Sequence, residues 1–233
     1  MLSIIGSPIG NLGDITLRAL ENLKEADLVA AEDTRRSLIL LNRYEISKPL
    51  ISFHQHNEAR RTAELVDHLR TGKRVAFLTD AGMPSISDPG YRLVRACIEN
   101  EIPFQVIPGS SAVLTALVGS GLSTDRFFFG GFLPVKSGQR ERELQGALAR
   151  ECTSVYFESP HRLLRSLEVL HQTDPIREIC VARELTKQFE EYRRGAAGDL
   201  IAHYTKRPPK GEITLVIAGT ADRTSLPRPS QES

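Results

Sequence analysis

The sequence carries no excess of charge of either sign. Its 233 residues include 30 Lys and Arg against 29 Asp and Glu, which gives a formal net charge of +1. This balance excludes a basic nucleic-acid-binding arm and an acidic tail, and it argues against RNA or DNA binding by bulk electrostatics. With 40% hydrophobic and 25% charged residues, the composition indicates a folded chain with one large domain or two small ones.

Cysteine is scarce as well, and long apolar runs are absent. Cys97, Cys152 and Cys180 lie far apart and form no C-x-x-C pair, which excludes a disulfide framework and a thiolate zinc site. No stretch approaches the ~18 apolar residues that span a bilayer, and the N-terminus lacks the features of a secretion signal. We therefore expect a cytoplasmic protein that does not contact a membrane.

The short motifs of several large enzyme classes are missing. The chain has no G-x-G-x-x-G dinucleotide fingerprint, no P-loop, no G-x-S-x-G nucleophile elbow and no H-E-x-x-H zinc helix. Gly6, Gly10 and Gly13 in the first turn are more widely spaced than the glycines of a dinucleotide site. These absences argue against hydride transfer, NTP hydrolysis and hydrolase chemistry.

Apolar runs alternate with amphipathic segments through the first half of the chain. The run at residues 75–79 suits a central strand that is covered on both faces. Asp14 is a candidate N-cap for the helix that follows the first turn, and residues 58–70 and 92–99 have helical periodicity. The alternation predicts a mostly parallel sheet that binds ligands at the carboxyl ends of its strands. Five strands are expected, at residues 2–5, 28–31, 50–53, 75–79 and 104–107.

A second series of elements begins after the small and polar residues 119–125. We therefore expect an N-terminal α/β domain at residues 1–120, a C-terminal α/β domain at 121–220 and a frayed tail at 221–233. In the second domain the run Phe127–Phe129 is expected to be core rather than a base-stacking platform. Further strands are expected at residues 154–157, 179–182 and 213–218, with a helix at 163–170.

The loops after the predicted strands are the unusual part of the sequence. They combine glycine turns and a small-residue helix start at residues 108–112 with the acids Glu32, Asp33, Asp80 and Asp88. Small residues let a ligand approach the backbone, and an acid at a strand end accepts hydrogen bonds from a ribose or faces a cationic group. This set suits a nucleoside-type cofactor with limited negative charge.

Several of these features also have purely structural interpretations. Asp80 could cap the turn after its strand, and residues 32–35 could begin a helix whose first turn is acidic. His54 and His56 would face the same side of a strand and suggest a metal pair. Because the sequence offers no third ligand nearby, we expect surface or hydrogen-bonded histidines and no metal site.

The strand-end loops, taken together and in order, resemble those of the ribosomal RNA small subunit methyltransferase I subfamily of the tetrapyrrole methylase superfamily. The resemblance extends from Leu2 to Gly219. The small basic C-terminal extension that members of this subfamily often carry has no counterpart before Ser233. The matching motifs are residues 6–16, 31–35, 54–57, 80–90, 108–112, 131–134, 158–162 and 183–187.

This resemblance implies S-adenosyl-L-methionine as the methyl donor. It also implies two α/β domains of the tetrapyrrole methylase type with the cofactor in the cleft between them, and a homodimer. The implied reaction is 2′-O-methylation of a cytidine ribose in the decoding region of 16S rRNA, within the 30S subunit. By motif position, the implied cofactor-binding residues are Pro8, Ile9, Asp80, Ala81, Gly82, Met83, Ser110, Ser111, Ala112, Phe157, Leu185, Ile213 and Thr214.

Methyl transfer to a ribose hydroxyl requires donor and acceptor at near-attack distance and benefits from a base. The candidate bases are Asp33, Glu32 and His54, of which Asp33 ranks first. Arg35 would bind phosphate or help to acidify the hydroxyl. The expected RNA-binding residues are Lys136, Arg140, Arg162 and Lys187.

The near-zero net charge is compatible with an RNA substrate if the basic groups are localised. Residues 1–120 hold 13 basic and 14 acidic groups, and residues 121–233 hold 17 and 15, with 13 of those 17 being Arg. Arginine suits bidentate phosphate contacts, so we expect a basic rim around a near-neutral cleft and a modest salt dependence. Two alternatives remain open: methylation of a tetrapyrrole or other small molecule by the same fold, and a noncatalytic ribosome-associated module.

Overall fold

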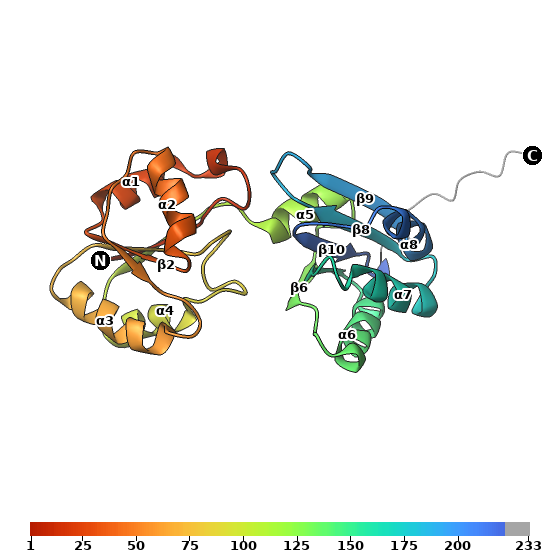
Figure 1. Ribbon diagram of the computed structural model, residues 1–233. Coiled ribbons are helices and arrows are strands. Elements are labelled where there is room, and N and C mark those ends of the chain that lie inside the picture. The colour runs from red at the N-terminus through yellow and green to blue at the C-terminus, as the bar shows by residue number, and fades with distance from the viewer. Residues whose placement is uncertain (222–233) are drawn as a thin grey trace, which may run out of the picture. The chain divides into compact units, whose positions relative to one another are not determined.

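The computed structural model describes residues 1–221, which form two α/β units (Figure 1). The first unit is Met1–Ser111 and the second begins at Ala112. The sequence analysis placed the division after residue 120, whereas the structure places it after Ser111. The reason is that helix α5 (Ala112–Ser120) packs against strands of the second sheet. The frayed tail expected at residues 221–233 lies outside the described residues, apart from Ala221.

The first unit contains the parallel five-stranded sheet that the sequence predicts. The strand order is β3-β2-β4-β1-β5, and every pairing is parallel. The apolar run that suggested a central strand forms β4, in the middle of this sheet. The strands are β1 (Leu2–Ile5), β2 (Leu28–Ala31), β3 (Leu50–Ser52), β4 (Val75–Leu78) and β5 (Phe104–Ile107).

Four α-helices connect these strands. The first begins after Thr16, whose hydroxyl oxygen accepts a hydrogen bond from the Ala19 N–H. The expectation that Asp14 is this N-cap is therefore wrong, because Asp14 ends the short 3-10 helix η1 (Leu12–Asp14) one turn earlier. The helices are α1 (Leu17–Glu25), α2 (Thr34–Arg43), α3 (Glu58–Arg70) and α4 (Tyr91–Glu99).

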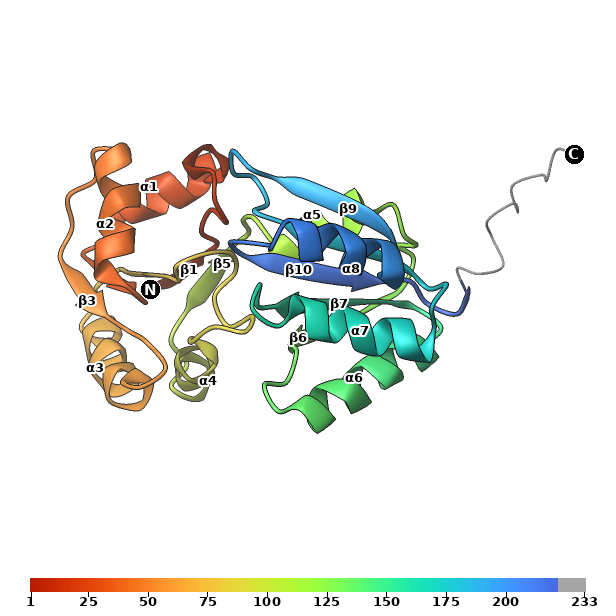
Figure 2. The ribbon, with the colours of Figure 1, turned by 45° about the vertical axis from the view of Figure 1, so that its right-hand side comes forward.

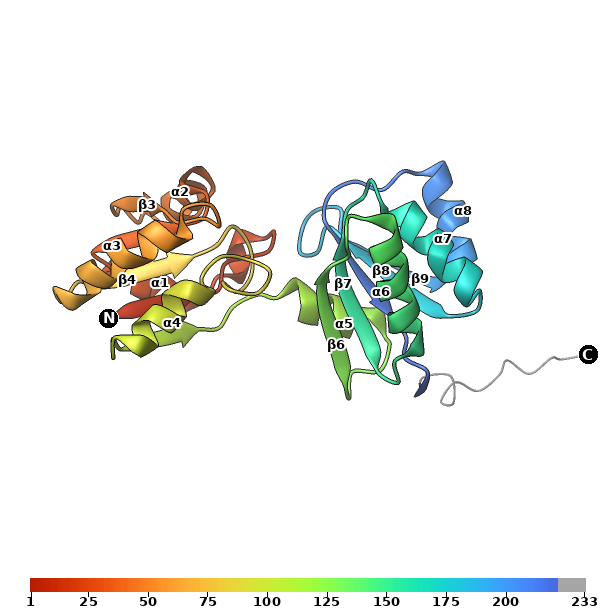
Figure 3. The same cartoon turned by 90° about the horizontal axis from the view of Figure 1, so that it is seen from below.

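The strand pleat divides the core of the first unit into two layers. Ile4 and Phe77 face α3 and α4, whereas Ile5 and Leu78 face α1 and α2. Figure 1 shows α1 and α2 above the sheet and α3 and α4 below it, and Figure 3 shows the latter pair from below. Phe77 is fully buried and contacts Phe53 edge to face, with 4.9 Å between ring centroids.

The second unit contains a mixed sheet in the order β6-β7-β10-β8-β9, in which only β6 and β7 pair in parallel. Helices α6, α7 and α8 lie side by side over one face of this sheet (Figure 2). Its strands are β6 (Phe127–Phe132), β7 (Thr153–Glu158), β8 (Glu178–Arg183), β9 (Glu191–Ala196) and β10 (Ile213–Ile217). The helices besides α5 are α6 (Ser137–Ala149), α7 (Leu163–Thr173) and α8 (Ala197–Lys206).

Strand β6 differs from the sequence prediction. Phe127 and Phe128 are 40% and 37% exposed and Phe132 is 62% exposed, so the expectation that Phe127–Phe129 is core is wrong for most of the run. The physical reason is the strand order, which places β6 at an edge of the sheet.

Within residues 1–221 no helix is long and apolar enough to cross a membrane.

Replacing Phe77 by alanine will lower the free energy of unfolding of the first unit by about 3–5 kcal/mol, because the substitution leaves a cavity beneath α3 and α4. Urea titration combined with hydrogen exchange of the β1 and β4 amides measures this effect. Phe132→Ala is the matched control and will change the stability by about 0.5 kcal/mol or less, since Phe132 is largely exposed. Equal losses in the two variants would contradict this description of the core.

Candidate functional site

The carboxyl ends of the parallel strands in the first unit gather at one edge of the sheet. There the loops after β1 and β5 touch through glycine. A Cβ atom added to Gly6 would lie 2.7 Å from the Gly109 Cα atom, and one added to Gly109 would lie 2.7 Å from the Gly6 carbonyl oxygen. Any larger side chain at either position would force these backbones apart.

The loop after β4 joins the same edge. Ser7 and Gly82 exchange backbone hydrogen bonds of 2.8 and 3.1 Å, and the Ser7 hydroxyl donates to the Thr79 carbonyl oxygen at 2.8 Å. Gly82 has φ of 75°, and the non-glycine residues Ser85 and Ser87 also have positive φ, at 72° and 63°. Backbone strain of this kind concentrates at functional loops, which supports the sequence prediction of a binding site here.

The structure brings together the predicted cofactor residues of the first unit. Pro8 and Ile9 are buried in the loop after β1, and the Ile9 side chain lies beside Gly82 in the loop after β4. The Ser110 carbonyl oxygen lies beside Gly82 as well. The remaining members of this set, in the same two loops after β4 and β5, are Asp80, Ala81, Met83 and Ser111.

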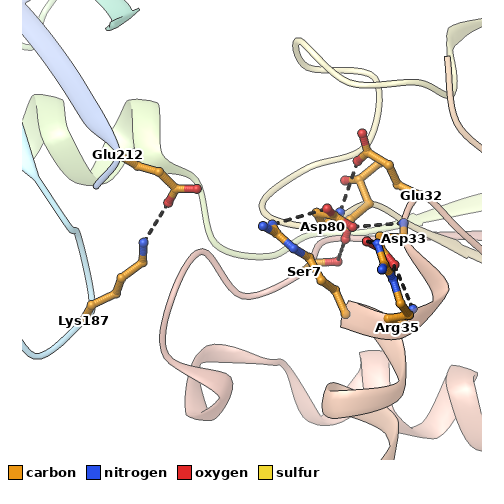
Figure 4. Close-up of polar contacts among 9 residues, drawn as sticks. Ser7, Glu32, Asp33, Arg35, Asp80, Lys187 and Glu212 are labelled. Atoms are coloured by element: carbon orange, nitrogen blue, oxygen red, sulfur yellow. Dashed lines mark hydrogen bonds and ion pairs between the residues drawn. The ribbon is translucent and has the colours of Figure 1, made fainter. Parts of the chain in front are cut away.

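Asp80 is the centre of a polar network between the ends of β2 and β4 (Figure 4). Its carboxylate accepts the Asp33 backbone N–H at 3.0 Å and forms an ion pair with Arg36 at 3.3 Å. The Asp80 backbone N–H in turn donates to the Glu32 carboxylate at 3.3 Å. Asp80 therefore joins two loops and does more than cap its own turn.

Asp33 is the N-cap of α2, which confirms that this segment begins a helix, although the first turn of that helix contains no acid. The Asp33 carboxylate accepts the Arg35 backbone N–H at 2.9 Å and binds the Arg35 guanidinium through both oxygens, at 3.2 and 3.0 Å. These hydrogen bonds to Arg35 lower the pKa of Asp33 to about 2. A carboxylate with such a pKa is a weak base, and the Arg35 guanidinium is already engaged.

Glu32 has the opposite electrostatic environment. It is half-buried, and burial raises its pKa, with the negative charge of Asp80 adding to the increase. Asp88, from the other end of the loop after β4, is close enough for its charge and that of Glu32 to interact. Besides Asp33, the edge therefore carries the carboxylates of Glu32, Asp80 and Asp88, and of these three Asp80 forms an ion pair with an arginine.

His54 lies in the loop after β3, not in a strand, and its ring lies edge to face with the ring of His56, with 5.9 Å between centroids. The His54 backbone N–H donates to the Asn57 side chain at 2.8 Å, and its Nε2 lies 3.2 Å from the Asn57 side-chain nitrogen. Within residues 1–221, no group of three or more His, Cys, Asp or Glu side chains is placed to hold a metal ion.

The second unit separates the predicted RNA-binding residues into two kinds. Lys136 is exposed. Arg140 is only 5% exposed and donates to the carbonyl oxygens of Pro134 and Val135, so it holds the turn between β6 and α6 and is not available to RNA. Arg162 and Lys187 are committed to ion pairs. Arg162 binds Glu158 at 3.1 Å. Lys187 binds Glu184 and Glu212, each at 2.9 Å, and Figure 4 shows the contact with Glu212.

The predicted cofactor residues of the second unit occupy neighbouring strands. Thr214 on β10 pairs with Phe157 on β7, and the adjacent Ile213 is buried. Leu185 is buried in the loop after β8, and Ala112 begins α5. Phe157 packs against the Phe129 and Phe132 rings, each at 5.1 Å between centroids.

Sequence reasoning missed two side chains that shape this edge and recognised a third only in part. Arg36 neutralises Asp80, and Glu58 accepts the backbone N–H groups of Gly90 and Arg92 at the start of α4. Asp88 was recognised only as an acid at a strand end. The sequence pattern places Glu58 at the start of a predicted helix but does not indicate its hydrogen-bond partners, because these lie more than 30 residues away in the chain.

Comparison with known proteins identifies the family. The family model described as Tetrapyrrole (Corrin/Porphyrin) Methylases matches residues 1–201. The chain is 48% identical over 219 residues to Ribosomal RNA small subunit methyltransferase I of Thermotoga maritima, covering 94% of this chain and 98% of that protein. It is also 48% identical to the protein of the same name from Synechocystis sp., covering 97% of this chain and 82% of that protein.

Solved structures share the fold at lower identity. Uroporphyrin-III-C-methyltransferase from Thermus thermophilus aligns with a TM-score of 0.64 at 23% identity, covering 97% of this chain and 99% of the other. The methyltransferase CobJ aligns with a TM-score of 0.70 at 18% identity, covering 94% of each chain. A further structure of the Thermus thermophilus enzyme, complexed with S-adenyl homocysteine, aligns with a TM-score of 0.66 at 19% identity, covering 96% and 99%. The expected fold class is confirmed, and the chain belongs to the tetrapyrrole methylase family and, within it, to the ribosomal RNA small subunit methyltransferase I proteins.

Proposed function

We propose that this protein transfers a methyl group from S-adenosyl-L-methionine to the 2′-oxygen of a cytidine ribose in the decoding region of 16S rRNA. The observation that carries the proposal is the 48% identity, over almost the whole chain, to two proteins named ribosomal RNA small subunit methyltransferase I. In this proposal the substrate is the 30S subunit, and the enzyme acts in the cytoplasm as a homodimer.

The first unit has features that fit the donor. The contact between Gly6 and Gly109 leaves no side chain between the loops after β1 and β5, so a ligand can reach their backbones. We assign the donor-binding role in this unit to those loops and to the loop after β4. When bound, the donor would supply a methyl group on a sulfonium sulfur, and the neutral thioether that remains after transfer is an excellent leaving group. The protein then mainly has to position the ribose, which contributes about 7–11 kcal/mol.

Glu32 replaces Asp33 as the proposed base. A base for a ribose hydroxyl must be able to take up a proton, and the raised pKa of Glu32 favours this more than the low pKa of Asp33. The Asp80 backbone N–H fixes one Glu32 oxygen and leaves the other for the substrate. Arg35 binds Asp33 through Nε and Nη2, but its side chain is 89% exposed, so we propose that its remaining Nη1 contacts an RNA phosphate.

Asp88 adjusts the charge beside this base. Burial, together with the negative charge of Glu32, raises the pKa of Asp88 to about 7. A proton on Asp88 therefore reduces the repulsion at the three-carboxylate edge, and its loss at higher pH strengthens the basicity of Glu32.

Methyl transfer from labelled donor tests the proposal directly. We expect tritium from S-adenosyl-L-methionine to enter 30S particles that lack the modification, at a ribose 2′-oxygen identified by nuclease digestion and mass spectrometry. Uroporphyrinogen serves as the competing acceptor, because the fold is shared with a uroporphyrin methyltransferase. Transfer to uroporphyrinogen alone would favour tetrapyrrole methylation. An absence of saturable heat on titration with the donor would instead indicate a noncatalytic module.

Glu32→Gln will reduce kcat by roughly 10²- to 10⁴-fold, the usual contribution of a general base. The donor affinity, measured by calorimetry, will be retained. Asp33→Asn is the matched control, since asparagine also caps helices, and it will retain kcat within about tenfold. A larger kcat loss in Asp33→Asn than in Glu32→Gln would restore Asp33 as the base.

The contribution of Asp88 to the free energy of unfolding will fall as the pH rises from 3.8 to about 7, because the folded state binds the Asp88 proton more tightly than the unfolded chain does. The stabilisation is complete below the unfolded pKa and is lost as the pH rises through the folded pKa. Asp88→Asn will remove this part of the pH dependence and raise the Tm at pH 8, as scanning calorimetry will show. Asp14→Asn, which removes an exposed carboxylate, is the control. The same dependence of Tm on pH in the wild type, Asp88→Asn and Asp14→Asn would refute the raised pKa of Asp88.

A further inference from the structure

One end of the second sheet gathers four loops of the second unit. The strand register aligns Phe132 with Phe157, and aligns Ile213 with both Glu158 and Arg183, so β6, β7 and β8 end where β10 begins. We call this the Ile213 end. The loops at residues 133–136, 159–162, 184–190 and 207–212 all extend from it. Helices α6 and α7 begin at this end and α8 ends there.

The acidic side chains at the Ile213 end are already partnered within the chain. Glu158 accepts hydrogen bonds from the Ser159 N–H and the Ser166 hydroxyl in addition to its ion pair with Arg162. Lys187 binds two further acids, and Arg183 binds Glu191 at 3.2 Å. These ion pairs occupy Arg162 and Lys187, which the sequence analysis assigned to RNA binding. They also leave little unpaired negative charge at the Ile213 end.

A second set of cations at this end has no such partner. Each is exposed, and none forms an ion pair with a carboxylate of residues 1–221. They are contributed by the start of α6, the first turn of α7, the end of α8 and the loop that leads into β10. The set is Lys136, Arg165, Lys206, Arg207 and Lys210. The Ile213 end therefore has a positive surface although the whole chain is close to neutral.

The segment between α8 and β10 presents two of these cations on a fixed backbone. Arg207 and Lys210 flank Pro208 and Pro209, whose rings restrict the chain. The Arg207 N–H donates to the His203 carbonyl oxygen at 3.0 Å, and the Arg183 guanidinium donates to the Lys210 carbonyl oxygen at 3.2 Å. Less conformational entropy is lost when such a segment binds a ligand.

Exposed aromatic side chains accompany the cations. Phe189 is 66% exposed in the loop after β8, and Phe132 is 62% exposed at the end of β6. The loop that carries Phe189 is held by the Lys187 ion pairs and by the Thr186 N–H, which donates to Glu190. Cations that bind phosphate, next to aromatic rings that stack on bases, are typical of surfaces that bind single-stranded RNA.

We propose that the Ile213 end binds single-stranded ribosomal RNA, with Lys136, Arg207 and Lys210 at phosphates and Phe189 stacked on an unpaired base. This inference rests on the proposed function and extends it by naming the RNA-binding surface. The pairs of Arg162 with Glu158 and of Lys187 with Glu184 and Glu212 position the loops and do not themselves bind the RNA.

The salt dependence of binding tests the phosphate contacts. Each neutralised phosphate of a single strand contributes about 0.7 to the steepness with which log affinity falls as log salt rises. We therefore expect this steepness to be smaller by about 2 in the triple variant Lys136→Gln/Arg207→Gln/Lys210→Gln. Fluorescence anisotropy with a single-stranded RNA oligonucleotide measures this, and KM for 30S particles gives a second readout. The control Lys24→Gln/Lys73→Gln/Arg126→Gln removes three exposed cations outside the Ile213 end and will leave the slope unchanged.

Phe189→Ala tests stacking. We expect roughly 5- to 150-fold weaker binding of the oligonucleotide, the equivalent of one lost base stack, with recovery in Phe189→Tyr. Phe127→Ala is the matched control, at an exposed ring that begins β6 at the opposite end of the sheet.

Three results would overturn this inference while leaving the proposed function intact. The wild type could methylate 30S particles while the triple variant kept its salt slope. The variants could weaken binding to 30S particles but not to the oligonucleotide, which would indicate a ribosomal protein as the partner. Phe189→Ala could bind as well as the wild type. Failure of the wild type to methylate 30S particles would instead refute the proposed function.

Discussion

The hydrogen bond from the Asp33 N–H to the Asp80 carboxylate is the contact on which the carboxyl edge of the first sheet depends. It joins two loops 47 residues apart, after the neighbouring strands β2 and β4. A half-buried carboxylate without partners would cost several kcal/mol, and here the N–H and Arg36 compensate it. The same contact places Glu32 next to a fixed negative charge. Burial is the main cause of the raised pKa of Glu32, and the fixed charge of Asp80 adds to it.

The fold of the first unit could be predicted from the sequence to a large extent. Its strands are short apolar runs, of which β1 and β4 are buried on both faces, and the helices between them have clear periodicity. Pattern alone therefore locates β4, α3 and α4. The rule that ligands bind at the carboxyl ends of parallel strands then located the loops that contain Gly6, Gly82 and Gly109. The resemblance to a known family supplied the cofactor, which residue chemistry alone could not.

The roles of single side chains could not be predicted, because each depends on partners that are remote in sequence. Asp33 and Glu32 are adjacent, yet one binds Arg35 and the other is buried beside Asp80. Lys187 looked like a free loop cation, but one of its two acids is Glu212, 25 residues later. The exposure of β6 has the same origin, since an apolar run does not reveal whether its strand is central or at an edge.

The abundance of arginine in the second half of the chain has a structural cause. Arg177 is buried and donates to the carbonyl oxygens of Leu148 and Ala218, and Arg194 donates to those of Gly119 and Ser120 at the end of α5. Arg140 acts in the same way near Pro134. A guanidinium has several donors in a fixed plane, so it can satisfy two carbonyl groups at once, which an ammonium on a flexible stem does less well. Arg140 and Arg177 are buried, so they add to the formal charge but not to the surface that a polyanion meets. The charge available for RNA therefore depends more on lysine. All four lysines after residue 120 lie at the Ile213 end, and those at positions 136, 206 and 210 form no ion pair with a carboxylate of residues 1–221.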